Sequence, residues 1–288
     1  MNISKECYLC IYKQIFNITK KFNLDDKKAS KVLREGAKIL SKYDIDVVPP
    51  LIAAEEYRKI EEILDIDDLF YKEKKLSIKE ALKFKPYLKE KLKLSSDKLF
   101  DACKVAVGGN VIDFGVHHEF SLEEEIKKIF DIEFKKNDYN EFKQKLVKSN
   151  TLCYLADNAG ENIFDEILIE EVIKEFNKHI KIYYVVRGKP IINDVTIKDL
   201  EGLEIWNLAE VIDSGVDSPG FLLSKANDIS KEIFYNSDLV ISKGMGNFEC
   251  LYEESNREVF YLYKVKCEVV ARKSNAEVGD YMLFKGDR

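Results

Sequence analysis

The sequence predicts an α/β protein in which a helical N-terminal part precedes a mostly parallel β-sheet. Two observations favour this fold. Residues 1–147 carry apolar side chains at helical spacing, whereas after residue 148 short β-prone runs alternate with helical stretches. Strands that alternate with helices of this length form mostly parallel sheets with right-handed crossovers. We therefore expect a helical domain at 1–147 and an α/β domain at 148–288.

The N-terminal part is predicted to be a series of helices. Segment 7–22 has a helical apolar face that includes Ile11, Ile15 and Ile18, and the Pro49–Pro50 pair breaks the next helical stretch. Two capping boxes, in which a serine and a glutamate three residues later satisfy free N–H groups, predict further helix starts. They are Ser77 with Glu80 and Ser121 with Glu124. Between them, the segment 96–110 is typical of a buried helix that ends at two glycines.

The second part contains four β-prone runs. They are TLCYLA (151–156), IYYVVR (182–187), DLVIS (238–242) and VFYLY (259–263). An amphipathic helix is expected over 163–178, between the first two runs. If these strands are parallel, the loops that follow them emerge at one edge of the sheet, where open α/β sheets bind their ligands.

Composition and charge exclude several classes of protein. The 288 residues are 34% charged, yet the net charge is only −6, so no basic excess indicates nucleic-acid binding. No apolar run approaches the roughly 20 residues that span a bilayer. The N-terminus lacks the basic-then-apolar order of a secretory signal, and the six cysteines do not form a disulfide framework. We therefore expect a cytoplasmic protein.

Polar residues follow the first two strands at the point where each ends. Asp157 and Asn158 come after 151–156, and Asp194 comes after 182–187. They offer only oxygen ligands, which Mg²⁺ and Mn²⁺ prefer, and such ions keep coordination positions open for water or substrate. Asp157 and Asn158 could instead cap the following helix. The additional carboxylate at Asp194 favours a metal site.

A lysine and a glycine-rich loop follow the third strand. Lys243, Gly244 and Asn247 lie where backbone N–H groups can approach a phosphate at a helix N-terminus, and the lysine adds a positive charge. The alternative is an ordinary strand–helix turn, since Gly-x-Gly alone is a weak signal. The other strand-end loops add Glu161 and Asp213, which could line the substrate site. Asn110 and Asp113, which follow a helix in the first half, are further candidates for binding substrate, although composition alone favours a helix-end turn there.

Cys7 and Cys10 form a CxxC pair on the first predicted helix. One pair supplies only half of a tetrahedral zinc site. A thioredoxin-like redox motif would follow a strand, and this pair does not. Buried thiols on one helix face are the favoured interpretation, with a metal or redox role as the alternative.

Taken together, the motifs make the chain similar to a known family. They are CYLC (7–10), GGNVIDFG (108–115), DNAGE (157–161), RGKPIINDVT (187–196), IDSG (212–215), PG (219–220), KGMGNFE (243–249) and KVKCEVVA (264–271). The chain resembles the domain-of-unknown-function-89 family of damage-control metal-dependent phosphatases, in particular its CxxC-containing archaeal and bacterial branch.

This resemblance implies a helical N-terminal part and a Rossmann-like, three-layer α/β domain. It also implies hydrolysis of phosphate monoesters of small metabolites, such as sugar phosphates, with Mn²⁺, Mg²⁺, Co²⁺ or Ni²⁺ as cofactor. By motif, Asp157, Asn158 and Asp194 would hold the metal, Lys243 would hold the phosphate, and Asn110 would line the site.

The nucleophile and two other functions stay open at this stage. Either a metal-bound water or the Asp157 carboxylate could attack phosphorus. A haloacid-dehalogenase phosphatase is excluded, because it needs Asp-x-Asp where this chain has Asp157-Asn158-Ala159. The alternatives are a non-catalytic module that binds a metal or a phosphometabolite, and a carboxyl methyltransferase that uses S-adenosylmethionine. The methyltransferase is disfavoured because its glycine loop would follow the first strand.

Overall fold

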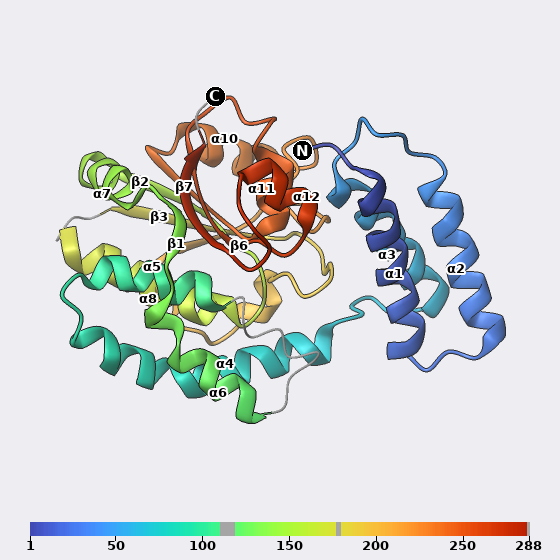
Figure 1. The fold of residues 1–288 in the computed structure, drawn as a ribbon, viewed down its shortest axis with the longest axis horizontal. Helices are drawn as coiled ribbons and strands as arrows, with labels where there is room; N and C mark the ends of the chain where they lie inside the picture. Colours follow the sequence, from blue (N-terminus) through green and yellow to red (C-terminus); the bar gives the residue numbers. More distant parts are fainter. Residues whose placement is uncertain (110–118, 177–179, 287–288) are drawn as a thin grey trace.

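The computed structural model describes residues 1–109, 119–176 and 180–286 and contains a seven-stranded sheet (Figure 1). The strands are β1 (Phe134–Asn137), β2 (Thr151–Leu155), β3 (Lys181–Val186), β4 (Glu210–Asp213), β5 (Leu239–Lys243), β6 (Val259–Lys264) and β7 (Tyr281–Gly286). Their order in the sheet is β1-β7-β6-β5-β2-β3-β4. Every neighbouring pair is parallel except β6 and β7.

The two faces of the sheet carry different apolar clusters. In β2, Leu152 and Tyr154 pack in one cluster, and Cys153 and Leu155 pack in the other. This alternation follows from the pleat, which points successive side chains to opposite faces. Since both faces are covered, the central strands are continuous apolar runs, as expected for a buried parallel sheet.

Helices cover both faces and make the domain a three-layer structure (Figure 1). The first face is covered by α4 (Tyr71–Lys93), α5 (Lys98–Gly108), α7 (Tyr139–Lys148) and α8 (Glu161–Phe176). The opposite face is covered by α10 (Asp228–Asn236), α11 (Met245–Leu251) and α12 (Glu268–Ser274). Short elements complete the chain. They are α6 (Glu119–Lys127), η2 (Ile129–Asp131), η3 (Ile197–Leu200) and α9 (Ile205–Leu208).

The first three helices form a separate bundle beside the sheet (Figure 1). They are α1 (Lys5–Lys21), α2 (Asp26–Leu40) and α3 (Pro49–Leu64). Asp25 caps α2 by accepting a hydrogen bond from the backbone N–H of Lys28 at 2.8 Å. Pro49 and Pro50 open α3, where a missing N–H has no cost because no intrahelical partner exists there.

The structure confirms the predicted fold class and corrects some of its details. All four predicted strands are present, with three further strands that the sequence pattern did not reveal: β1, β4 and β7. The two predicted capping boxes are wrong, because Ser77 lies inside α4 and Ser121 inside α6. In the first turn of α4, the buried Lys74 instead pairs with Asp68 at 2.8 Å and with Asp199 at 2.7 Å.

The domain boundary at residue 147 stays a prediction. Helices α4, α5 and α7 precede it in the chain, yet their apolar residues pack in the same cluster as those of β2 and β3. In the described part of the chain, no helix is long and apolar enough to cross a membrane.

Candidate functional site

Two loops at the carboxyl edge of the sheet are joined by backbone hydrogen bonds. The Val195 N–H donates to the Asp157 carbonyl at 2.8 Å, and Asn158 and Asp194 form an antiparallel bridge. The loops follow the adjacent parallel strands β2 and β3. This pairing brings together the three residues that were predicted to bind metal.

Arg187 holds the Asp194 carboxylate in place. Its Nε donates to Asp194 Oδ2 at 2.6 Å, and its Nη2 lies 3.9 Å from Asp157 Oδ1. The guanidinium is buried, with 2% of the residue exposed. Arg187 was not among the predicted site residues, although an arginine that directly follows an apolar strand could have signalled a role.

Lys243 belongs to a buried ionic cluster with Glu161 and Asp165. Its Nζ is 2.7 Å from Asp165 Oδ1 and 3.2 Å from Glu161 Oε2, and the residue is fully buried. Burial alone lowers the pKa of Lys243, but the Asp165 and Glu161 carboxylates raise it above its ordinary value. Lys243 is therefore a fixed cation whose described partners are carboxylates. Whether it also holds a phosphate stays a prediction.

Asp165 connects this ionic cluster to two strands of the sheet. Its carboxylate accepts hydrogen bonds from Tyr154 at 2.6 Å and from Tyr184 at 2.8 Å. The two tyrosine rings stack, with centroids 5.4 Å apart. Because the tyrosines come from the neighbouring strands β2 and β3, the anchor is part of the sheet. Asp165 was not among the predicted site residues.

The buried cluster holds more negative than positive side chains. Asp157, Glu161, Asp165 and Asp194 are buried, and among the described residues the buried cations within 4 Å of them are Arg187 and Lys243. Burial raises the pKa of Glu161 to about 7, although Lys243 opposes the shift. Burial also raises the pKa of Asp157, with the Asp194 charge adding to it, and raises the pKa of Asp194 against the effect of Arg187. Such a cluster favours an added cation.

The site fits a divalent cation by its donors. Two carboxylates and one amide supply oxygen, which hard cations prefer. Asn158 Nδ2 donates to Asp157 Oδ2 at 2.9 Å and to Glu161 Oε1 at 2.7 Å, so the amide lies directly against these carboxylates. In the described ranges, no three or more His, Cys, Asp or Glu side chains are grouped in a metal-binding arrangement, so a cation here would rely on Asn158 as well.

Gly244 permits the close approach of the β5 loop to Asp157. Its φ is +79°, and a Cβ added there would lie 2.0 Å from Asp157 Oδ2. A side chain at this position would therefore displace the carboxylate, and L-residues rarely adopt this backbone conformation.

Asn247 joins the loops of the site from inside. Its Oδ1 accepts from Phe221 N at 2.7 Å and from Arg187 Nη2 at 2.9 Å. Its Nδ2 donates to the carbonyl oxygens of Lys243 at 2.7 Å and Ala156 at 3.0 Å. The side chain is fully buried, and these four bonds use its hydrogen-bonding capacity. Its predicted contact with substrate stays a prediction.

Lys266 is an exposed cation next to the buried cluster. It follows β6, and its charge lowers the pKa of both Asp157 and Glu161, against the larger effect of burial. An exposed lysine beside buried carboxylates can meet a phosphate that enters from solvent. Lys266 lies in the KVKC motif but was not among the predicted site residues.

Of the other predicted residues, one contacts its own loop and two cannot be placed. Asp213 ends β4 and is exposed, and its Oδ1 accepts from the Gly215 N–H at 2.7 Å in its own loop. Asn110 and Asp113 lie outside the described residues. The last described residue before them is Gly109, where an added Cβ would lie 3.2 Å from the Glu161 Cα.

The CxxC pair is divided between interior and surface. Cys7 is buried and accepts a hydrogen bond from the Ser4 N–H, whereas Cys10 is exposed. The expectation of two buried thiols is therefore wrong for Cys10, because the buried stripe of α1 runs through Cys7, Ile11, Ile15 and Ile18, and Cys10 lies to one side of it. A redox role for the pair stays a prediction.

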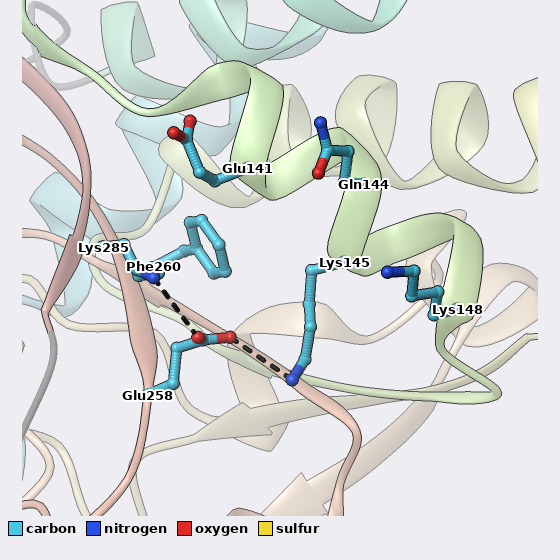
Figure 2. A pocket seen from close by; sticks show the side chains of 7 residues that line it. All are labelled: Glu141, Gln144, Lys145, Lys148, Glu258, Phe260 and Lys285. Atoms are coloured by element: carbon cyan, nitrogen blue, oxygen red, sulfur yellow. Dashed lines mark ion pairs between the residues drawn. The ribbon is translucent and has the colours of Figure 1, made fainter.

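A surface hollow lies near the amino ends of the parallel strands, on the side of the sheet away from Asp157; Figure 2 shows its lining residues. It is lined by Glu141, Gln144, Lys145, Lys148, Glu258, Phe260 and Lys285. Glu258 lies 3.3 Å from Lys145 and 3.7 Å from Lys285, so ion pairs partly neutralise the lining. Parallel α/β sheets bind ligands at the other edge, where Asp157 lies.

The fold and the site define an α/β protein with a buried acidic centre at the carboxyl edge of a mostly parallel sheet. Residues 3–282 match the family described as damage-control phosphatase ARMT1-like domain. The chain therefore belongs to this family.

Curated relatives support the assignment over almost the whole chain. A damage-control phosphatase of Pyrococcus horikoshii is 32% identical, with 99% of this chain and 98% of the relative covered. A damage-control phosphatase of Archaeoglobus fulgidus is 32% identical, with 97% and 98% covered. An uncharacterized protein of Methanocaldococcus jannaschii is 31% identical, with 99% and 96% covered.

A solved structure agrees with the fold. The crystal structure of a DUF89 family protein from Pyrococcus horikoshii superposes with a TM-score of 0.91 at 31% identity, and both chains are covered completely. The resemblance inferred from the motifs is thus confirmed at the level of the family. The more specific assignment to a CxxC-containing branch stays a prediction.

Proposed function

We propose that this protein is a divalent-metal-dependent phosphatase that hydrolyses monoesters of small phosphorylated metabolites. The observation that carries the proposal is the backbone pairing of Asn158 with Asp194, which brings the half-buried amide next to the buried carboxylates of Asp157 and Asp194. Membership of a family whose relatives are named damage-control phosphatases supports the phosphatase assignment.

In this proposal, different residues of the site bind the cation, orient its ligands and attract the phosphate. Asp157, Asn158 and Asp194 would hold the cation, and Arg187 fixes the Asp194 carboxylate by its 2.6 Å hydrogen bond. Lys266 would attract the phosphate at the exposed side. When bound, a divalent cation neutralises phosphate charge and makes phosphorus more electrophilic. Water or the Asp157 carboxylate would attack phosphorus as the bond to the ester oxygen breaks and the alcohol leaves. In the second route, water would then hydrolyse the phosphorylated Asp157, so acid quenching distinguishes the two, because only that route leaves a phosphorylated protein.

The test is hydrolysis of p-nitrophenyl phosphate by chelator-stripped protein, with Mn²⁺, Co²⁺, Ni²⁺ or Mg²⁺ restored one at a time. We expect metal-restored turnover that Asp157→Ala lowers by more than about 100-fold, because a metal ligand is lost. Glu258→Gln, at the opposite edge of the sheet, is the control and should retain turnover.

Two outcomes would reject this assignment. Turnover that survives in Asp157→Ala would place the chemistry elsewhere. Metal binding without turnover of this ester or of a panel of phosphorylated metabolites would indicate a non-catalytic binding module.

A further inference from the structure

The loop that carries Asp194 is inserted into the bundle formed by α1, α2 and α3. Ile191, three residues before Asp194, is 1% exposed and belongs to the bundle's own apolar cluster, with Ile192 packed against it. The buried members of that cluster from the bundle and the following loop are Ile15, Ile18, Val32, Ala53, Tyr57, Ile60 and Leu69. Among the described residues, Ile191 is the one buried member of this cluster that comes from the α/β part.

A polar contact holds the same loop at a second point. Arg58, on α3, donates from Nη2 to the Pro190 carbonyl. The same guanidinium pairs with Glu61 and lies 3.9 Å from Asp217. The bundle therefore binds this loop through both an apolar side chain and a backbone carbonyl.

The backbone between these anchors and Asp194 is strained. Ile192 has φ +40°, which is costly for a β-branched residue, of the order of 1–3 kcal/mol. Such a conformation persists where its surroundings fix it. On the far side, the Asn193 carbonyl accepts from the Ala159 N–H at 2.8 Å, so the loop is held between the bundle and the Asp157 loop.

We propose that the bundle is a positioning part of the metal site, and that Ile191 is its principal anchor. Ile191 touches neither metal nor substrate. It fixes the loop so that Asp194 lies in register with Asp157 and Asn158. This inference rests on the proposed function, because it assigns Asp194 to the metal. It gives the N-terminal helices a role in catalysis through the loop that they hold.

The test compares Ile191→Ala with Ile60→Ala in the full chain. Both isoleucines are almost fully buried, 1% and 2% exposed, in the same cluster, but only Ile191 belongs to the loop. Mn²⁺ binding is measured by calorimetric titration of chelator-stripped protein, and thermal unfolding is followed in parallel. We expect Ile191→Ala to weaken Mn²⁺ binding by about 10-fold or more, as loss of an outer support does.

The accompanying results separate positioning from stability. Ile60→Ala should lower the unfolding temperature as much as Ile191→Ala while leaving the Mn²⁺ dissociation constant within about twofold. At saturating Mn²⁺, the kcat of Ile191→Ala should approach that of the unaltered protein, and Ile191→Val should restore most of the Mn²⁺ affinity. Equal Mn²⁺ binding by both alanine variants, whether weakened or unchanged, would overturn the proposal.

A milder variant covers the case in which Ile191→Ala does not fold. Arg58→Met removes the contact with the Pro190 carbonyl and should weaken Mn²⁺ binding several-fold, and unchanged binding would overturn the proposal. Failure of the proposed function would be seen differently, in the unaltered protein itself, which would then either bind no Mn²⁺ or bind Mn²⁺ without turnover.

Discussion

Lys266 is the residue whose position suggests the first contact with a phosphate. It is exposed, yet its charge acts on two buried carboxylates of the site. In Lys266→Met, kcat/KM for p-nitrophenyl phosphate should fall by about 100-fold, because one cation that neutralises the phosphate is lost. Lys266→Arg keeps the charge and should lose less. Steady-state kinetics at saturating metal would check this, and an unchanged kcat/KM in Lys266→Met would remove the residue from the site.

Asn247 is important for a different reason. Its four buried hydrogen bonds join the loops that follow β2, β3, β4 and β5. Asn247→Ala leaves several polar groups without partners and should cost roughly 2–4 kcal/mol in unfolding free energy. Urea denaturation measures this, with the exposed Asn207→Ala as control. Unchanged stability with a raised KM would instead favour the substrate contact predicted from the sequence.

At the scale of the element, α3 contains a buried carboxylate inside the bundle. Glu56 is 1% exposed, and neither of its oxygens has a hydrogen-bond partner within the described ranges. Burial raises its pKa from 4.5 to about 8, with a contribution from the charge of Glu55. Between these two pH values the folded state keeps a proton that the unfolded state releases. The unfolding free energy therefore falls as pH rises from about 4.5 to about 8.

Glu56→Gln should remove this part of the pH dependence. Relative to the unaltered protein, we expect the variant to gain unfolding free energy between pH 5 and pH 9, by up to about 4 kcal/mol. Thermal unfolding across this range is the measurement, and Glu62→Gln, an exposed position on the same helix, is the control. Parallel stability curves for Glu56→Gln and the unaltered protein would contradict the assignment.

Burial of the individual strands explains which of them could be recognised from the sequence pattern. The strands β2, β3, β5 and β6 are buried on both faces, so each is an apolar run that stands out from the helices around it. The edge strands β1 and β4 read FKKN and EVID, because an edge carries charges that discourage further pairing. Their identity as strands depends on tertiary contacts that local sequence does not encode.

At the scale of the whole molecule, the candidate site was predictable where it follows those apolar runs. Asp157, Asn158 and Asp194 each follow a recognisable strand, and the structure brings them together. Asp165 lies within helix α8, where a carboxylate is normally a solvated side chain. The role of the bundle could not be predicted either, because Ile191 resembles any apolar loop residue until its packing partners are known.

The pairing of β1 with β7 also bears on how the chain is made. β1 is synthesised near the middle of the chain, but in the described structure it pairs only with β7, which follows every other strand. During synthesis on the ribosome, the backbone N–H and C=O groups of β1 therefore have no strand partner until β7 is available. The edge of β6 that pairs with β7 is exposed for the same period. Completion of the sheet thus requires residues 281–286. A nascent chain interrupted before that point would expose the unpaired backbone of β1 and one edge of β6, which chaperones and proteases can recognise.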